Sequence, residues 1–264
     1  MSVTTSRRSI VRLLDSADAV TVPDDLAVEA PLILGLGADV IATLMRTPGH
    51  DIELAAGWLV VESGVRHRED VESLRQCRED DTDRVHITLR PGVRAPRPRA
   101  YVTSSACGVC SADILDLEPF GPDTSHTAGW TVPRSVLAAL PDSLLTRQRA
   151  FARTGGVHAA AVADSAGELL VVREDVGRHN AVDKVVGWAL LEARLPATDH
   201  LLVVSGRVSF EIVQKALACG VAGVVAVSAP SSLAVDLVRE HGLLLAGMVR
   251  DGRMNVYAGH DLIS

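Results

Sequence analysis

The chain has 264 residues, of which 47% are hydrophobic and 22% are charged, and this composition excludes general disorder. Its 33 acidic residues against 26 basic ones argue against a protein that binds nucleic acid or an anionic membrane over its whole surface. There is no uninterrupted apolar run of about 18 residues, and the N-terminus lacks the apolar core of a signal peptide. We therefore expect a cytoplasmic protein with neither a nucleic-acid nor a membrane partner.

The first half of the chain predicts two segments. Residues 1–28 alternate short apolar runs with Ser, Asp and Pro and are predicted to be a leader or an edge strand. Residues 29–130 are predicted to form an N-terminal α+β portion, with a strand at 30–36, a helix from Asp51 and a strand at 85–89. Residues 66–84 mix acidic and basic side chains and are predicted to be a solvated face or an excursion rather than a binding surface.

Residues 131–264 predict an α/β domain. A short helix after Pro133 precedes a hairpin with strands at 157–163 and 168–172. An apolar stripe from Val182 to Leu190 predicts a long helix that faces the core. Strands at 201–204, 221–227 and 243–245 then alternate with helices from Arg207 and Ser231, which is typical of a parallel sheet covered on both faces.

The chain has one closely spaced cysteine pair, Cys107 and Cys110, in a loop of small residues. Such a pair can shuttle a disulfide, hold half of a zinc site, or present one reactive thiolate with a resolving partner. The Pro-rich and Ser-rich residues before it disfavour a thioredoxin-like site, whereas the arginines between residues 90 and 99 favour a thiolate. Cys77 and Cys219 have no His or Cys near them in the sequence, so both are predicted to pack rather than to bind zinc.

His158 follows two glycines at the start of a predicted strand. Zinc deaminases carry His-x-Glu before Pro-Cys-x-x-Cys, with the Glu moving the protons. Here Ala160 occupies the Glu position and the cysteine pair precedes the histidine. We therefore disfavour a hydrolase with zinc on Cys107, Cys110 and His158, expect no bound zinc, and keep a core histidine as the alternative interpretation.

Residues 174–180, EDVGRHN, lie between a predicted strand and the long helix. Asp175 or Asn180 could cap the helix, with the neighbouring side chains solvated. Alternatively, this loop could hold ligand groups, because α/β sheets place them between strands and helices. In the second interpretation, His179 is the candidate for proton transfer or for contact with a phosphate.

Three loops follow strands of the predicted parallel sheet and should meet at its carboxyl edge. Two of them lead into helix N-termini, where free N–H groups and the helix dipole favour an anion. The third adds two guanidinium groups suited to phosphate. The sequence therefore predicts a phosphate-bearing ligand such as a nucleotide, although it has neither a Walker A nor a GxGxxG motif. The residues expected at this edge are Ser205, Arg207, Ser228, Arg250 and Arg253.

Six motifs follow one another along the chain: MRTPG at 45–49, SACGVC at 105–110, GGVHAA at 155–160, EDVGRHN at 174–180, VSAP at 227–230 and GRMNVY at 252–257. Together they resemble the FdhD-type accessory sulfurtransferases of formate dehydrogenase, over about residues 29–257. The resemblance implies a three-layer α/β C-terminal domain of cytidine-deaminase-like fold, without the zinc and glutamate of the deaminases, beside a smaller N-terminal α+β portion. It also implies a homodimer.

The resemblance further implies the reaction. A cysteine desulfurase would load sulfane sulfur onto Cys107 as a persulfide, which passes to the molybdenum cofactor before its insertion into formate dehydrogenase. The ligand would be the bis(guanine dinucleotide) form of molybdopterin, which a guanine nucleotide would mimic. Cys110 would resolve the persulfide, tune Cys107 or be dispensable. The cofactor-binding segment of the family maps onto Val249, Arg250, Asp251, Gly252, Arg253 and Met254.

The sequence departs from the family pattern after the second cysteine. The family often has Gly and a basic residue there, whereas this chain has Ser111 and Ala112. We expect the arginines between residues 90 and 99 to supply the missing charge for docking to the desulfurase. The alternative function is a non-catalytic chaperone of the molybdenum cofactor with a structural Cys-x-x-Cys, and it predicts that Cys107→Ala leaves maturation of formate dehydrogenase intact.

Overall fold

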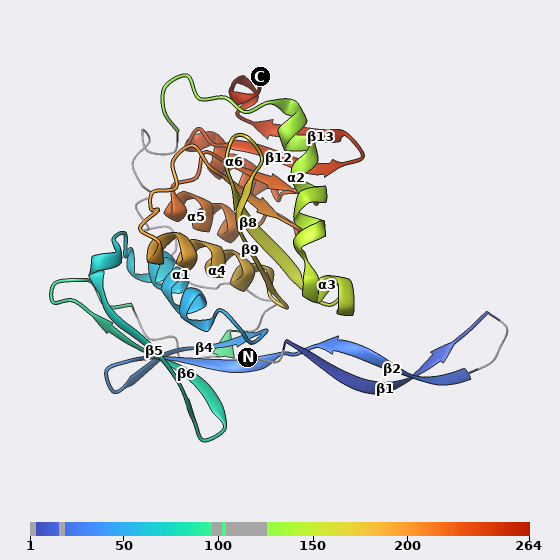
Figure 1. Cartoon of the computed structure of the whole chain (residues 1–264). Helices are drawn as coiled ribbons and strands as arrows, with labels where there is room; N and C mark the ends of the chain where they lie inside the picture. Colours follow the sequence, from blue (N-terminus) through green and yellow to red (C-terminus); the bar gives the residue numbers. More distant parts are fainter. Residues whose placement is uncertain (1–3, 16–18, 97–101, 104–125) are drawn as a thin grey trace.

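The computed structural model describes residues 4–15, 19–96, 102–103 and 126–264, which form three sheets and several helices (Figure 1). The α/β fold class predicted from the sequence is confirmed. Cys107, Cys110, Ser111 and Ala112 lie outside the described residues, and so do two of the arginines between residues 90 and 99. Among the described helices, none is both long and apolar enough to cross a membrane.

Six strands form the larger sheet, in the order β13-β12-β11-β10-β8-β9. They are β8 (His158–Ala163), β9 (Leu169–Asp175), β10 (Leu201–Val204), β11 (Gly223–Ala226), β12 (Leu244–Arg250) and β13 (Arg253–Ala258). Only β10, β11 and β12 are parallel neighbours, because β8 and β13 join them in the antiparallel sense. The parallel arrangement predicted for these three strands and the hairpin predicted for β8 and β9 are therefore confirmed.

The last predicted strand is longer than expected, and a further strand follows it. β12 continues to Arg250 rather than ending at residue 245, and the chain then turns back as β13. β13 is an edge strand with no fully buried residue, so it has no apolar run that would reveal it in the sequence.

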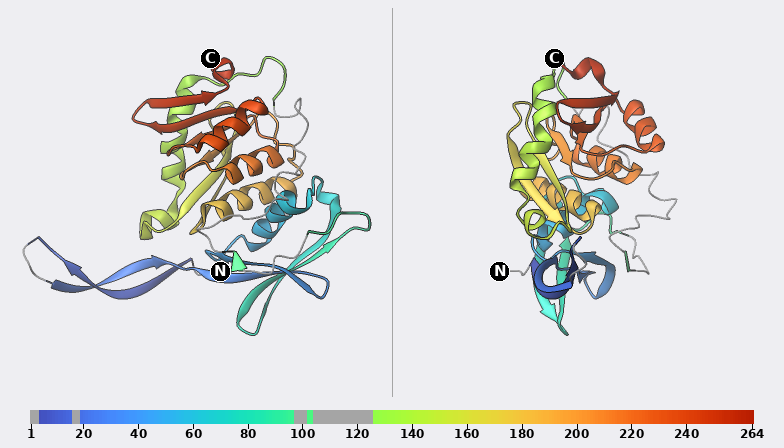
Figure 2. Two further views of the ribbon diagram at one scale, coloured as in Figure 1. Left: turned by 180° about the vertical axis from the view of Figure 1, so that it is seen from behind. Right: turned by 90° about the vertical axis from the view of Figure 1, so that its right-hand side faces the viewer.

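Helices cover both faces of this sheet, which gives the three layers expected (Figures 1 and 2). On one face lie α4 (Arg178–Leu191), α5 (Phe210–Cys219) and α6 (Ser232–Glu240). On the other face, α2 (Arg134–Arg147) packs its leucines against Ala161, Val203 and Val225 and leads into α3 (Arg149–Thr154). α5 begins at Phe210 rather than at Arg207, because Val208 forms a β-bridge with Pro230.

Five strands form the N-terminal sheet, in the order β5-β6-β3-β4-β7. They are β3 (Ala30–Leu36), β4 (Asp39–Arg46), β5 (Val71–Glu79), β6 (Thr82–Leu89) and β7 (Val102–Thr103), with the 3₁₀ turn η1 (Arg68–Asp70) before β5. Most of residues 66–84 belong to the β5–β6 hairpin, and none of their charged side chains is buried, so the predicted solvated face is confirmed although strand β5 was not predicted. Their charged side chains lie on the exposed parts of these strands and obscure the strand pattern in the sequence.

Helix α1 (Asp51–Ser63) joins the two sheets by packing on α4 (Figure 1). A Cβ atom on Gly57 would lie 1.8 Å from the carbonyl oxygen of Asp183, and one on Gly187 would lie 1.8 Å from that of Glu53. The two helix backbones can approach this closely only because both positions lack a side chain. Buried residues of both sheets and of these helices form one continuous hydrophobic cluster.

The first described strands, β1 (Thr5–Leu13) and β2 (Ala19–Ala27), form an antiparallel ribbon that projects from the body of the molecule (Figures 1 and 2). Its attachment includes an ion pair between Arg153 of α3 and Asp25, at 3.1 Å. The predicted leader thus contains two paired strands.

Candidate functional site

The carboxyl ends of four strands lie at one edge of the larger sheet. β10, β11 and β12 run in the same direction, and β9 shares that direction because β9 and β10 are both antiparallel to β8. The loops that leave this edge lead into α4, α5 and α6. His158, the first residue of β8, lies at the same edge. This topology brings together the loops that the sequence selected for an anionic ligand.

A cavity of about 540 Å³ opens at this edge. One wall comes from α2 and α3 and their connection, through residues such as Leu145 and Phe151, and the backbone of Gly155 and Gly156 borders it. Among the residues selected from the sequence, four line the cavity: Ser205, Val249, Arg250 and Asp251. The others do not belong to its lining: Arg207, Ser228, His179, Gly252, Arg253 and Met254.

Ser205 is held by two hydrogen bonds to Ala159, the second residue of β8. Its backbone N–H donates to the carbonyl oxygen of Ala159 at 3.0 Å, and its Oγ accepts from the N–H of Ala159 at 2.9 Å. The hydroxyl oxygen is thereby fixed as an acceptor, while its own hydrogen can still be donated to a ligand. Ser205 is therefore suited to bind an acceptor such as a phosphate oxygen.

The predicted cofactor segment is the tight hairpin between β12 and β13. Asp251 and Gly252 occupy its two turn positions with φ of 51° and 70°, which is the left-handed region that Asp-Gly turns favour. Arg250 and Arg253 are directly opposite each other across this turn, and both are exposed. Met254 instead packs against the hydrophobic cluster beneath α2. The hairpin thus carries two exposed arginines on facing positions, of which Arg250 belongs to the cavity lining.

His158 lies half-buried in the wall of the cavity, among positive charges. Burial lowers its pKa first, and the charges of Arg178, His179 and Arg207 lower it further. A Cβ atom on Gly206 would lie 3.3 Å from Nδ1 of His158 and 3.6 Å from the side chain of Arg178, so the glycine lets these groups approach. The imidazole is therefore neutral at pH 7, and an anion in the cavity would favour its protonation.

His179 points to a different neighbour. Its Nε2 lies 2.9 Å from Oε2 of Glu211 and 3.2 Å from Oγ of Ser209, both at the start of α5. Burial works to raise the pKa of Glu211, but the hydrogen bond and the charge of His179 outweigh it and the pKa is lowered. The structure thus places His179 between the first turns of α4 and α5 and outside the cavity lining, while its nearness to His158 adds to the local positive charge.

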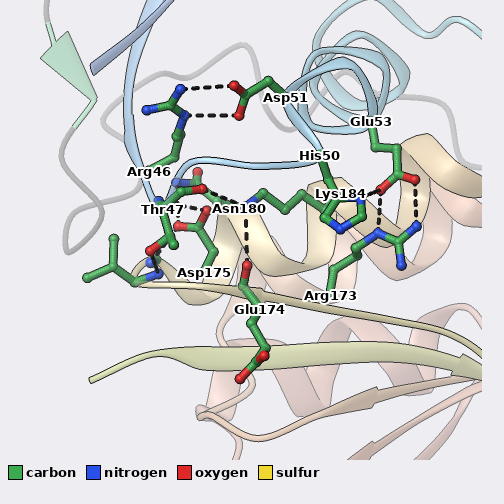
Figure 3. Close-up of polar contacts among 12 residues, drawn as sticks. Arg46, Thr47, His50, Asp51, Glu53, Arg173, Glu174, Asp175, Asn180 and Lys184 are labelled. Atoms are coloured by element: carbon green, nitrogen blue, oxygen red, sulfur yellow. Dashed lines mark hydrogen bonds and ion pairs between the residues drawn. The ribbon is translucent and has the colours of Figure 1, made fainter. Parts of the chain in front are cut away.

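The motifs at 45–49 and 174–180 meet in a buried polar network beneath the cavity edge (Figure 3). Nζ of Lys184 lies 2.7 Å from Oδ2 of Asp175 and donates to the carbonyl oxygen of Thr47 at 2.9 Å. Asp175 accepts from the backbone N–H of Thr47 at 3.1 Å, and Asn180 donates to the carbonyl oxygen of Met45 at 2.8 Å. Asp175 and Asn180 therefore join the N-terminal sheet to α4, which begins after Gly177 without a side-chain cap.

A second ion pair supports the same junction. Arg46, fully buried, donates from Nε and Nη2 to the two carboxylate oxygens of Asp51 at 3.0 and 2.9 Å (Figure 3). Nη2 also donates to Asp83 at 2.6 Å, which connects β4 to β6. The sequence gives no direct sign of this network, apart from the motif at 45–49 that contains Arg46.

The two described cysteines differ. Cys219 is buried in α5, where burial raises the pKa of its thiol to about 12, so its predicted packing role is confirmed. Cys77 lies half-buried on β5, and the hairpin register brings His86 of β6 close to it. Cys77 has no histidine near it in the sequence, but cross-strand pairing brings His86 beside it in the fold.

Known proteins that resemble this chain agree on one family. The sequence model of the FdhD/NarQ family matches residues 27–264. A protein of Streptomyces coelicolor named sulfur carrier protein FdhD is 45% identical, over 100% of this chain and 97% of the relative. The protein of that name from Mycolicibacterium paratuberculosis is 44% identical over the whole of both chains, and that of Saccharolobus solfataricus is 38% identical over the whole of both chains.

The fold has a counterpart among solved structures. A crystal structure from Desulfotalea psychrophila, described as a formate dehydrogenase accessory protein, aligns with a TM-score of 0.80 and 24% identity. The alignment covers 99% of this chain and 100% of the other, so the two proteins share one fold. With the family match over residues 27–264 and relatives at 44–45% identity over the whole chain, this chain belongs to the FdhD/NarQ family.

Proposed function

We propose that this protein is a cytoplasmic sulfur carrier that serves formate dehydrogenase. Cys107 takes sulfane sulfur from a cysteine desulfurase and passes it to the molybdenum cofactor, in its bis(guanine dinucleotide) form, before insertion into the enzyme. The curated relatives are named sulfur carrier proteins, which supports the sulfur-carrying role. The observation that carries the proposal is the cavity at the sheet edge, because Ser205, Val249, Arg250 and Asp251 line the same hollow.

The loading step is an exchange between a persulfide and a thiolate. The Cys107 thiolate attacks the outer sulfur of the desulfurase persulfide, a new S–S bond forms on Cys107, and the desulfurase cysteine leaves as a thiolate. Nearby positive charge favours a thiolate, and four arginines at residues 90–99 precede Cys107 in the sequence. Cys110 then resolves the persulfide, tunes Cys107 or is dispensable, and single variants distinguish these roles.

The cavity suits one nucleotide unit of the cofactor rather than the whole. Its volume of about 540 Å³ falls within the range of small-molecule sites, about 300–1,000 Å³. Arg250 in the lining, and Arg253 opposite it on the hairpin, can bind phosphate oxygens in bidentate fashion. His158 and Ser205 add groups that can donate hydrogen bonds in the wall. Guanosine diphosphate is therefore the appropriate probe of this site.

Mass spectrometry of sulfur loading tests the proposal. The protein is incubated with a cysteine desulfurase and cysteine, and the intact chain and its peptides are weighed for wild type, Cys107→Ala and Cys110→Ala. We expect a gain of one sulfur on the Cys107 peptide that dithiothreitol removes and that Cys107→Ala abolishes. A resolving role for Cys110 predicts that Cys110→Ala accumulates the persulfide.

The chaperone alternative makes a different prediction. If wild type gains no sulfur but still binds guanosine diphosphate, and Cys107→Ala supports full maturation of formate dehydrogenase, the protein delivers the cofactor without carrying sulfur. Sedimentation of the purified chain measures the homodimer that we expect for the working protein. Metal analysis of the same sample tests the deaminase-like alternative, which requires zinc on Cys107, Cys110 and His158.

A further inference from the structure

The β5–β6 hairpin of the N-terminal sheet brings three metal-binding side chains together, on a different sheet from the cavity. Within the part of the chain that the structure describes, the ligand atoms of Cys77, Glu79 and His86 all lie within 4.8 Å of one another. Oε1 of Glu79 is 3.4 Å from Sγ of Cys77 and 3.0 Å from Nε2 of His86. None of these residues has a part in the proposed sulfur transfer.

The hairpin register explains the cluster. Cys77 pairs with Arg84, Arg75 pairs with His86, and Glu79 pairs with Thr82. Side chains two apart on a strand point to the same face, and the residue diagonally opposite lies within reach. Cys77 and Glu79 therefore share a face with His86. The neighbouring strand β3 places Gly35 beside His86, where even a Cβ atom would lie 3.8 Å from Nδ1, so the ring has room above this strand.

We propose that Cys77, Glu79 and His86 bind a zinc ion, with water as the fourth ligand. A thiolate, an imidazole and a carboxylate are the donors that tetrahedral zinc sites use, and the thiolate disfavours Mg²⁺ and Ca²⁺. With ligands at about 2.0–2.3 Å, the ligand atoms of such a site lie roughly 3.3–3.8 Å apart. The separations of 3.4 Å between Cys77 and Glu79 and 3.0 Å between Glu79 and His86 are close to this range. Small side-chain rotations therefore bring the ligand atoms into a tetrahedral arrangement.

The charges around the cluster are compatible with a cation. Nε of Arg84 lies 3.2 Å from Oε2 of Glu79, which leaves Oε1 directed at Cys77 and His86. Arg75 is the other cation near Cys77. Zinc binding releases the thiol proton to the solvent, so two anionic ligands face the ion and offset much of the repulsion from the two arginines.

This proposal differs from the expectation from the sequence that the chain binds no zinc. That expectation treated Cys77 as isolated, whereas the fold supplies a histidine and a carboxylate from the same hairpin. The metal would connect β5 to β6 at the solvent-exposed end of the sheet and would protect the Cys77 thiol from oxidation.

The test uses the full chain with Cys107→Ser and Cys110→Ser, so that the cysteine pair cannot account for bound metal. Zinc affinity is measured by competition with a chromophoric chelator, and Co²⁺ is added as a spectroscopic probe. We expect one zinc per chain and a thiolate-to-cobalt charge-transfer band. Adding Cys77→Ser should abolish the band, and adding His86→Gln should weaken zinc binding by at least about tenfold, since even changes beyond the direct ligands cost tenfold or more.

Glu72→Gln is the matched control, because Glu72 is an exposed carboxylate on the same strand outside the cluster. It should change the affinity by less than twofold. Absence of stoichiometric zinc in the chain without the pair overturns the proposal, and so does zinc that persists after Cys77→Ser. Because the test protein lacks the thiols of Cys107 and Cys110, which the proposed sulfur transfer uses, neither result bears on that proposal.

Discussion

The ammonium group of Lys184 lies 2.7 Å from Oδ2 of Asp175, and both side chains are withdrawn from solvent, with 1% and 0% of their surface exposed. The pair connects α4 to the end of β9, and Thr47 joins it from the N-terminal part of the chain. The β9–α4 loop, which lies beside the cavity, is thus held by groups from both halves of the molecule.

Lys184→Met should destabilise the protein strongly. It leaves the buried carboxylate of Asp175 without its countercharge, and loss of one partner of a buried pair costs about 3–5 kcal/mol. Chemical denaturation measures the free energy of unfolding. Asp236→Asn, at an exposed carboxylate of α6, is the control and should change it by less than about 0.5 kcal/mol. Equal effects of the two substitutions would show that the pair does not support the fold.

Gly57→Ala and Gly187→Ala should each force α1 and α4 apart. The added Cβ would meet a backbone carbonyl of the opposite helix at 1.8 Å, and backbone cannot rotate away as a side chain can. We expect a loss of about 3 kcal/mol or more in the free energy of unfolding. Gly35→Ala is the control, since its Cβ would make only ordinary contacts, at 3.6 Å and beyond. Unfolding midpoints that match the wild type would contradict the close helix packing.

Arg250→Gln should weaken the binding of guanosine diphosphate. A hydrogen bond to a charged group contributes about 1.5–3 kcal/mol, so the dissociation constant should rise roughly tenfold to a hundredfold. Isothermal titration calorimetry measures it. Arg194→Gln, beyond the C-terminal end of α4 at the opposite edge of the sheet, is the control. A ligand that binds both variants equally well does not occupy the cavity edge.

His158 should link the stability of the protein to pH. Burial and the neighbouring cations lower its pKa in the folded protein, so the unfolded chain binds the proton more tightly. The contribution of the neutral imidazole is full above about pH 6.5 and is lost as the pH falls through the lowered pKa. The difference in unfolding midpoint between wild type and His158→Gln should therefore be constant above about pH 6.5, and wild type should lose stability relative to the variant as the pH falls below this value. A constant difference at all pH values would contradict this assignment.

Cys219 should resist alkylation in the native protein. Its thiol is buried and its pKa is about 12, so almost no thiolate is present at neutral pH. Peptide mass spectrometry of the metal-free protein after iodoacetamide treatment should find Cys219 modified only after unfolding, whereas Cys77, half-buried, should react in the native state. Modification of both at similar rates would show that α5 opens readily.

Hydrophobic periodicity predicted the elements that are buried on a regular face. The stripe from Val182 to Leu190 became α4, and the apolar runs of β3, β8 and β10 were each predicted within about one residue. Periodicity failed for β5 and β13, because strands that expose most of their side chains carry charges instead of an apolar run. A periodic pattern of apolar residues appears only where one face of an element is buried, and β5 and β13 have almost no buried residues.

The order of the motifs in the sequence determined the family, and the alternation of strands and helices placed Ser205 and Arg250 at one sheet edge, because parallel strands share a carboxyl end. Only the tertiary structure decided which distant groups meet. Thr47 reaches Asp175 across 128 residues, α2 and α3 close the cavity, and a hairpin register brings His86 to Cys77. These contacts depend on strand register and on how the helices pack. Both are set by the fold of the whole chain and leave no periodic signal in the sequence.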